Sequence, residues 1–172
     1  MIRIGIISPS EIAFRRFMPA LSLLSDNFKF VGIAYATPQE WFDNPAEVAD
    51  DVIDNQQTVE RNKAQQFIDN YGGKLYHGYE SLIKSDDVDA VYIPLPPALH
   101  YKWAEKALTC RKHVFVEKPS TISLQDSKAL VNKVFVIREE DYIIRILYHL
   151  HPQHLIHIVH HICKCEISKI LT

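Results

Sequence analysis

The sequence predicts an α/β fold, a doubly wound parallel sheet with helices on both faces. Short apolar segments at 2–7, 28–36 and 90–93 alternate with longer segments whose apolar residues recur at helical spacing. The first strand is followed by a turn, a helix and a second strand, the order that opens a dinucleotide-binding unit. A further run, Val114-Phe115-Val116, ends in a charged pair and a proline. Strands this apolar are covered on both faces, as in parallel sheets.

The composition is that of a soluble domain. The 172 residues are 47% hydrophobic and 23% charged, enough for one sizeable core. A net charge of −2 gives no indication of nucleic acid or an anionic membrane as a partner. No apolar run is long enough to span a bilayer, and the start lacks the apolar region of a signal peptide. We interpret the three cysteines as reduced thiols and expect a cytoplasmic protein.

The first strand, at 2–7, leads into a turn at 8–11 and then a helical segment. Pro19 predicts that this helix breaks into two pieces, because proline cannot donate a helical hydrogen bond. The side chains that we expect it to bury are Ala13, Phe17, Leu21 and Leu24.

After the second strand, two helix-start patterns follow each other. Thr37 to Glu40 and Asn44 to Glu47 each combine a capping residue, a proline and a glutamate. They predict two short helices within 38–54, an acidic insertion of unassigned function. We expect the next helix at about 57–71, ended by two glycines. Its predicted buried residues are Ala64, Phe67, Ile68 and Tyr71.

The second half predicts the same alternation. Strands are expected at 74–77, 90–93 and 142–148. Helices are expected at 79–84, 98–109 and 124–137, the last burying Leu124, Val131, Val134 and Phe135. Arg111 follows the second of these helices, where a glycine would favour a left-handed cap, so a different turn is predicted there.

The segment from Lys112 to Pro119, KHVFVEKP, carries the most specific signal. Pro119 should end the strand, which places Glu117 and Lys118 at the carboxyl edge of the sheet, where such folds bind ligands. The segment resembles the signature of the Gfo/Idh/MocA family of NAD(P)-dependent oxidoreductases. The string EIAFRRFMPAL at 11–21 is similar to the sugar-nucleotide ketoreductase branch of that family.

This resemblance implies a Rossmann-like domain and hydride transfer between NAD or NADP and a carbon of a sugar or sugar nucleotide. It implies that Lys118 lies beside the nicotinamide and the substrate, where it polarises a carbonyl or passes a proton. Glu117 would contact the nicotinamide ribose, and Leu95 and Pro96 would line the adenosine side. His100, kept from the family's P-N-x-x-H pattern, is expected to order its turn.

The phosphate loop departs from the family's GxGxxG/A pattern. Aligned on the first turn, it becomes Ser8, Ser10 and Ala13. A serine hydroxyl can bond a phosphate oxygen, although its Cβ adds bulk where the backbone must approach closely. Glu11 would oppose a pyrophosphate, while Arg15 and Arg16 (both on the following helix) either face a phosphate or belong to a solvated face.

The cofactor choice stays open at the end of the second strand. Tyr35 and its neighbours supply neither the acid that binds the ribose of NAD nor the arginine that favours NADP. The residues that we expect at the cofactor are Ser8, Ser10, Glu11, Ile12, Tyr35, Leu95, Pro96, His100, Glu117 and Lys118, with Lys118 also catalytic.

The sequence suggests two unequal parts. Residues 1–150 form the dinucleotide-binding domain, and 151–172 would be a helix and strand that begin a substrate domain. Since family members are roughly twice as long, we interpret the chain as a fragment or a truncated product. The strings His151-Pro152-Gln153 and Glu166 to Ile170 resemble the start of that second domain. Its apolar side, if exposed, would favour homo-oligomers.

Two alternatives compete with the enzyme. The lost loop glycines and the missing substrate domain fit a non-catalytic nucleotide-binding fragment or a degenerate gene product. A cluster of six histidines and two cysteines at 149–165 raises the question of a metal, with His157, His161 and Cys163 or Cys165 as ligands. Its spacing matches no standard zinc module, so we predict no metal site.

Overall fold

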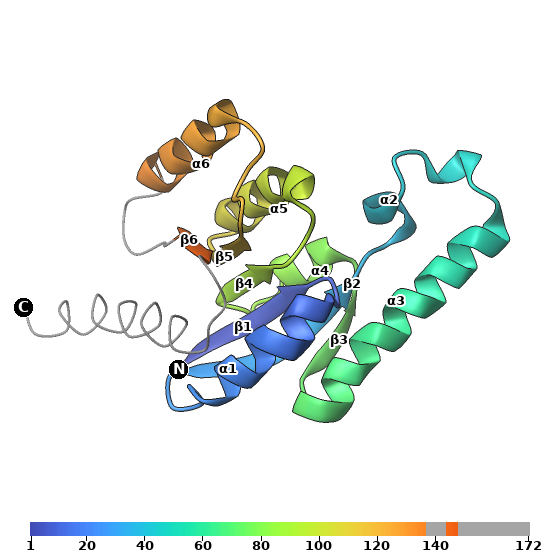
Figure 1. Cartoon of the computed structure of the whole chain (residues 1–172), viewed down its shortest axis with the longest axis horizontal. Coiled ribbons are helices and arrows are strands. Elements are labelled where there is room, and N and C mark those ends of the chain that lie inside the picture. Colours follow the sequence, from blue (N-terminus) through green and yellow to red (C-terminus); the bar gives the residue numbers. More distant parts are fainter. Residues whose placement is uncertain (137–143, 148–172) are drawn as a thin grey trace, which may run out of the picture.

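The fold is a single six-stranded parallel sheet with helices on both faces (Figure 1). The computed structural model describes residues 1–136 and 144–147, with side chains through residue 133. The strands lie in the order β3-β2-β1-β4-β5-β6, which confirms the doubly wound prediction. Their bounds are Ile2–Ile7 (β1), Phe28–Tyr35 (β2), Lys74–His77 (β3), Ala90–Ile93 (β4), His113–Glu117 (β5) and Ile144–Leu147 (β6).

The helices divide between the two faces of the sheet. The helical elements are η1 (Ala13–Phe17), α1 (Met18–Ser22), α2 (Pro38–Trp41), η2 (Pro45–Glu47), α3 (Asp50–Tyr71), α4 (Tyr79–Ile83), α5 (Pro97–Thr109) and α6 (Leu124–Val136). The η1–α1 segment and α3 pack on one face, and α4, α5 and α6 cover the other. Among the described helices, none is long and apolar enough to cross a membrane.

Two apolar layers hold the sheet. Phe17 and Phe67 pack with Tyr92 on the first face, and Trp103 and Leu108 pack with Val114 on the second. The central strands are therefore covered on both sides, which is why their sequences are almost continuously apolar.

The helix after β1 passes through Pro19 without a break in the chain direction. A turn of π-helix over η1 comes first, with the Met18 N–H donating to the Ala13 carbonyl, and α1 follows directly. The wider turn changes the hydrogen-bonding register just before Pro19, so the missing proline donor falls in the first turn of α1. The two helical pieces predicted around Pro19 are therefore a π-helix and an α-helix that follow each other directly.

The segment after β2 is shorter than predicted. The Thr37–Glu40 capping box is present, with both reciprocal hydrogen bonds. However, α3 begins at Asp50 rather than near 57. The first turn of α3 carries two acidic residues, which favour a helix start. The side chains from Asp50 to Val52 are exposed, so burial gives little signal of where the helix begins.

Arg111 adopts the left-handed conformation that the sequence argued against, with φ of 58°. The Lys112 N–H donates to the Ala107 carbonyl, and the Arg111 N–H donates to the Leu108 carbonyl, each at 2.9 Å. This pair of bonds is the Schellman cap, normally built on glycine. The two bonds offset a backbone cost of roughly 1–2 kcal/mol.

The predicted burial of two α6 residues is wrong. Leu124 and Val131 are 72% and 53% exposed, and Leu130 packs into the core. Lys133 further ties α6 to Glu105 of α5 at 3.0 Å. Successive helical residues point about 100° apart, so Val131 lies at the side of the helix when its neighbour Leu130 faces the core. The side chains of 134 and 135 lie outside the described part.

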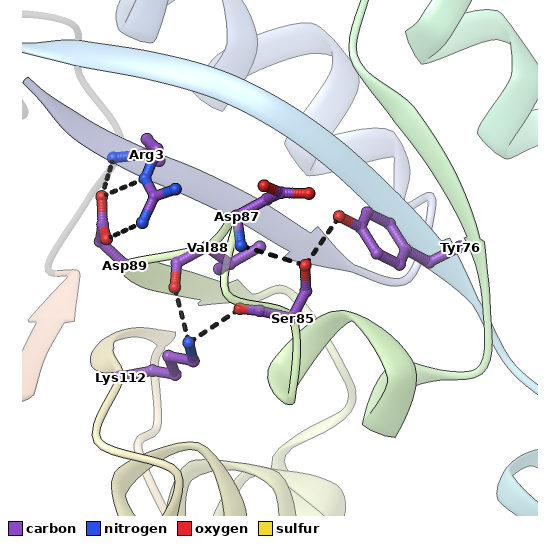
Figure 2. A network of polar contacts seen from close by, with 7 residues as sticks. All are labelled: Arg3, Tyr76, Ser85, Asp87, Val88, Asp89 and Lys112. Carbon is purple, nitrogen blue, oxygen red and sulfur yellow. Dashed lines mark hydrogen bonds and ion pairs between the residues drawn. The ribbon is translucent and has the colours of Figure 1, made fainter.

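A polar network ties together the amino ends of three strands (Figure 2). The Arg3 guanidinium contacts both carboxylate oxygens of Asp89, at 2.6 and 2.9 Å. Lys112 donates to the carbonyl oxygens of Ser85 and Val88, at 2.9 and 2.7 Å. Lys112, the first lysine of the KHVFVEKP segment, therefore supports the strand ends opposite to the ligand edge.

The Arg3–Asp89 pair predicts a pH-dependent stability. The hydrogen bond from Arg3 lowers the pKa of Asp89 in the folded state, with burial partly opposing. A lowered folded pKa stabilises the fold above the unfolded value, near 4, and this contribution is lost as the pH falls through the folded pKa. Asp89→Asn should therefore lower the thermal midpoint at pH 7 by about 2–4 °C. The loss should shrink towards pH 3.

Thermal unfolding followed by circular dichroism at both pH values measures this effect. Asp87→Asn is the matched control, because it removes one negative charge near Arg3 without breaking the paired contact. An equal loss for Asp89→Asn at pH 7 and pH 3 would contradict the linkage.

Candidate functional site

The carboxyl ends of β1, β4 and β5 form the candidate site. The strand order reverses between β1 and β4, so the crossover connections leave this edge in opposite directions. Such a reversal leaves a crevice in which open α/β sheets bind ligands. The turn after β1 and the loop after β4 lie at this edge, together with Glu117, the last residue of β5, and Lys118, which follows it.

The turn after β1 keeps a glycine-like backbone without glycine. Ser8 has φ of 81°, in the left-handed region. Its N–H donates to the Ala34 carbonyl at 2.9 Å, and its own carbonyl accepts from the Ser10 N–H at 3.0 Å. This places a serine in the conformation that the first glycine of a phosphate loop provides.

Ser10 caps the helix that follows. Its hydroxyl oxygen accepts from the Ala13 N–H at 3.2 Å, which leaves the hydroxyl proton able to donate elsewhere. Glu11 and Ile12 start the helical turns and are exposed. Glu11 forms an ion pair with Arg15 on the surface, with 3.4 Å between Glu11 Oε1 and Arg15 Nη1, and both side chains are more than 70% exposed. This geometry fits the solvated-face interpretation of Arg15.

Tyr35 ends β2 as half of an aromatic pair. Its ring stacks on that of His77, with centroids 4.8 Å apart and planes 17° from parallel. Gln57 of α3 bridges the pair to the backbone, 3.0 Å from His77 Nε2 and donating to the Ala36 carbonyl at 3.0 Å. Sequence reasoning missed His77 and Gln57. His77 could have been found as the last residue of the neighbouring strand β3, because it pairs in register with Tyr35 at the end of β2.

His100 joins two loops of the site. Its ring is fully buried, with Nε2 2.6 Å from the Leu95 carbonyl oxygen and Nδ1 2.8 Å from that of Pro119. Both partners are main-chain carbonyl oxygens, which only accept, so each ring nitrogen lies where its N–H can donate to one of these loops. The β4 loop and the Glu117–Pro119 segment are thus tied together. Leu95 is buried beneath this contact, and Pro96 is exposed.

Glu117 is fixed by a buried tyrosine. The Tyr92 hydroxyl donates to Glu117 Oε1 at 2.5 Å. The Phe17 ring stacks on the Tyr92 ring, with the two ring centroids 3.8 Å apart. Burial and the adjacent carboxylate raise the pKa of Tyr92, so it remains a donor. Sequence reasoning did not find Tyr92, because it looks like any other residue of a buried strand.

Lys118 follows at the strand end, and its peptide bond to Pro119 is cis. The side chain is exposed in this domain. The described residues alone therefore do not form the partly dry cleft in which a lysine is best suited to proton transfer.

Comparison with known proteins settles the family. The family model GFO_IDH_MocA, described as an oxidoreductase family with an NAD-binding Rossmann fold, matches residues 27–135. The chain belongs to the Gfo/Idh/MocA family. The predicted family is therefore confirmed.

Several relatives within this family are sugar-nucleotide reductases. A dTDP-3,4-didehydro-2,6-dideoxy-alpha-D-glucose 3-reductase of Actinomadura kijaniata is 32% identical over 155 residues, 89% of this chain and 39% of the relative. One of Streptomyces violaceoruber is 35% identical over 131 residues, 76% of this chain and 31% of the relative.

A solved structure gives the same match in three dimensions. KijD10, a 3-ketoreductase of Actinomadura kijaniata in complex with NADP and TDP-benzene, superposes with a TM-score of 0.66 at 32% identity. The match covers 89% of this chain and 39% of KijD10. The chain thus spans 31% to 39% of the length of these Gfo/Idh/MocA proteins. The boundary predicted at residue 150 and the histidine cluster lie outside the described residues.

Removing the Tyr92 hydroxyl tests how Glu117 is held. Tyr92→Phe should lower the free energy of unfolding by about 1–2 kcal/mol, because a part-buried carboxylate loses its charge-assisted donor. Chemical denaturation measures the loss. Tyr101→Phe, on a part-buried tyrosine of α5, is the control and should cost less. Equal stability of the two variants would contradict the proposed support of Glu117.

Proposed function

We propose that this chain is the dinucleotide-binding part of an oxidoreductase that transfers hydride between NAD(P) and a carbon of a sugar or sugar nucleotide. The observation that carries the proposal is the meeting of three segments at one sheet edge. The serine turn, the His100-tied loop and the Glu117–Lys118 pair all lie where the strand order reverses, in a chain of an NAD-binding family.

The described residues suggest a place for each part of the cofactor. The main-chain N–H groups of the first helical turn (Glu11 and Ile12) and the free proton of Ser10 suit a pyrophosphate. Tyr35 ends the strand that faces the adenosine ribose in folds of this kind. Leu95 and Pro96 would line the adenosine side.

The nicotinamide end would lie at the end of β5. Glu117 keeps one carboxylate oxygen on Tyr92 and has the second to accept from a ribose hydroxyl. His100 would act by holding the Pro119 carbonyl, and through it the lysine, in place.

Lys118 would serve the reacting carbonyl. As hydride reaches the carbonyl carbon, the carbonyl oxygen gains negative charge and then a proton. An ammonium group beside that oxygen donates a hydrogen bond and can supply the proton. The exposure of Lys118 in this domain implies that further protein, or the substrate itself, must cover it during the reaction.

A sugar nucleotide is the substrate class that the relatives favour, because several of them are reductases of a dTDP-linked deoxyglucose and KijD10 was solved with a TDP compound and NADP. The residues that select the sugar would lie in the part of those proteins that this chain does not span.

A second function has its own support. A nucleotide-binding protein without catalysis would also keep the crevice, and the exposure of Lys118 is compatible with it. The two functions differ in what Lys118 must do.

Calorimetric titration of the purified chain with NADH and with NADPH tests the binding site. We expect micromolar binding to at least one of them, since the turn after β1 retains its backbone geometry without glycine. The tighter of the two identifies the cofactor. No heat with either would contradict the proposal.

Lys118→Met separates catalysis from binding. We expect the affinity for the dinucleotide to change by about twofold or less, whereas reduction of a dTDP-ketosugar should fall by a factor of about 100 or more. Lys128→Met, an exposed lysine of α6, is the control and should change neither. Equal turnover for Lys118→Met and the unsubstituted chain would contradict the catalytic role.

A further inference from the structure

The end of β2 lacks the side chain that reads the adenosine ribose in dinucleotide-binding folds. That side chain is an acid in proteins that bind NAD, and an arginine lies nearby in those that bind NADP. Here β2 ends at Tyr35, and Ala36 and Thr37 follow. For a ribose bound at this edge, another part of the chain has to supply the contact. The neighbouring strand β3 ends beside Tyr35 with a histidine, His77.

His77 is held against Tyr35 by its ring and by its main chain. The two residues pair in register, and their rings stack with centroids 4.8 Å apart and planes 17° from parallel. The Gly78 N–H also donates to the Tyr35 carbonyl at 2.8 Å, which closes the two strands at the same point. The His77 side chain is nevertheless exposed, so a ligand can reach it.

A single carboxylate joins the residues that follow the two strands. Glu40 of α2 accepts from the Thr37 N–H at 2.9 Å, after β2, and from the Tyr79 N–H at 2.8 Å, after β3. The ends of β2 and β3 are therefore fixed relative to each other before a ligand binds. Such preorganisation reduces the cost of ordering a binding site.

Gln57 of α3 determines which nitrogen of the His77 ring carries a proton. Its amide nitrogen donates to the Ala36 carbonyl at 3.0 Å, a group that only accepts. Its amide oxygen therefore faces His77 Nε2, 3.0 Å away, and this nitrogen has to donate. In the neutral ring Nδ1 is then a hydrogen-bond acceptor. Within the described residues, Nδ1 has no hydrogen-bond partner.

An acceptor at this place suits a hydroxyl group rather than a phosphate, and the charge of the following segment acts in the same direction. Residues 36–54 contain no lysine or arginine, and their six acidic residues are Glu40, Asp43, Glu47, Asp50, Asp51 and Asp54. The next basic residue, Arg61, is one turn beyond Gln57 on α3, which runs from the carboxyl edge of the sheet towards its amino edge. A 2′-phosphate at the end of β2 would therefore meet negative charge without a cation from this segment.

We propose that His77, oriented by Gln57, is the residue that selects the cofactor, and that its Nδ1 accepts a hydrogen bond from the 2′-hydroxyl of the adenosine ribose. The chain therefore binds NADH in preference to NADPH, whereas KijD10 was solved with NADP. Gln57 is a positioning residue, since it acts on the ribose only through His77. This inference rests on the proposed function, because it names the cofactor of the same site.

Calorimetric titrations with NADH and NADPH at pH 8, where histidine side chains are ordinarily neutral, test the selection. The unsubstituted chain should bind NADH about tenfold more tightly than NADPH, the ratio that one hydrogen bond provides. His77→Phe keeps an aromatic ring to stack on Tyr35 but has no acceptor. It should weaken NADH binding about tenfold and change NADPH binding by about twofold or less.

Gln57→Leu tests the positioning role with a readout that needs no ligand. NMR of the His77 ring nitrogens should show the Nε2–H form in the unsubstituted chain and a larger share of the Nδ1–H form in the variant. NADH binding should weaken about threefold, and in the His77→Phe background Gln57→Leu should have no further effect. Gln65→Leu, at an exposed glutamine of the same helix that bonds Asp69, is the matched control and should change neither readout.

The outcomes separate this inference from the proposed function. If the chain binds NADPH as tightly as NADH, or if His77→Phe leaves the ratio of the two affinities unchanged, the role of His77 is overturned and the proposed function stands. If the neutral ring carries its proton on Nδ1 in the unsubstituted chain, the positioning by Gln57 is overturned. If neither dinucleotide binds, the proposed function fails and the selection by His77 fails with it.

Discussion

The reversal of strand order between β1 and β4 is the constraint on which the site depends. Right-handed crossovers place α1 and α3 on one face of the sheet and α4 to α6 on the other. The connections after β1 and β4 must then diverge, and no side chain is needed to open the space between them. What the sequence has to supply is a set of loops rigid enough to use that space. The buried His100, held between two carbonyl oxygens from different loops, shows how this is done.

Hydrogen bonds accompany a left-handed backbone without glycine at two turns, one at this edge and one at the opposite end of the sheet. The chain has 5 glycines in 172 residues, and two left-handed positions are filled by Ser8 and Arg111. The Schellman bonds hold Arg111, and at Ser8 the N–H donates to the Ala34 carbonyl while the Ser8 carbonyl accepts from the Ser10 N–H. Each device offsets a local backbone cost with a contact that a motif search does not see. A missing glycine fingerprint is therefore weak evidence against a phosphate loop when such partners are present.

The sequence predicted what short-range patterns encode. The strand at 90–93 and the Thr37–Glu40 capping box follow from residue type and spacing, and both are confirmed. The contact of Glu40 with Tyr79 joins residues 39 positions apart, and no local pattern records it. The start of α3 differs from the prediction because its first side chains are exposed. The burial predicted for Leu124 and Val131 is wrong because, among the α6 side chains that the structure describes, Leu130 is the one that enters the core. The roles of the cofactor residues stay predictions.

Amide hydrogen exchange with and without saturating NADH or NADPH tests the central claim, that the reversed sheet edge is the dinucleotide site. We predict slower exchange on binding at residues 8–13, with smaller effects beside Leu95 and Lys118. We expect no change around Arg3 and Asp89, at the opposite ends of the strands. Unchanged exchange at 8–13 under saturation, or protection confined to the Arg3–Asp89 end, would contradict it.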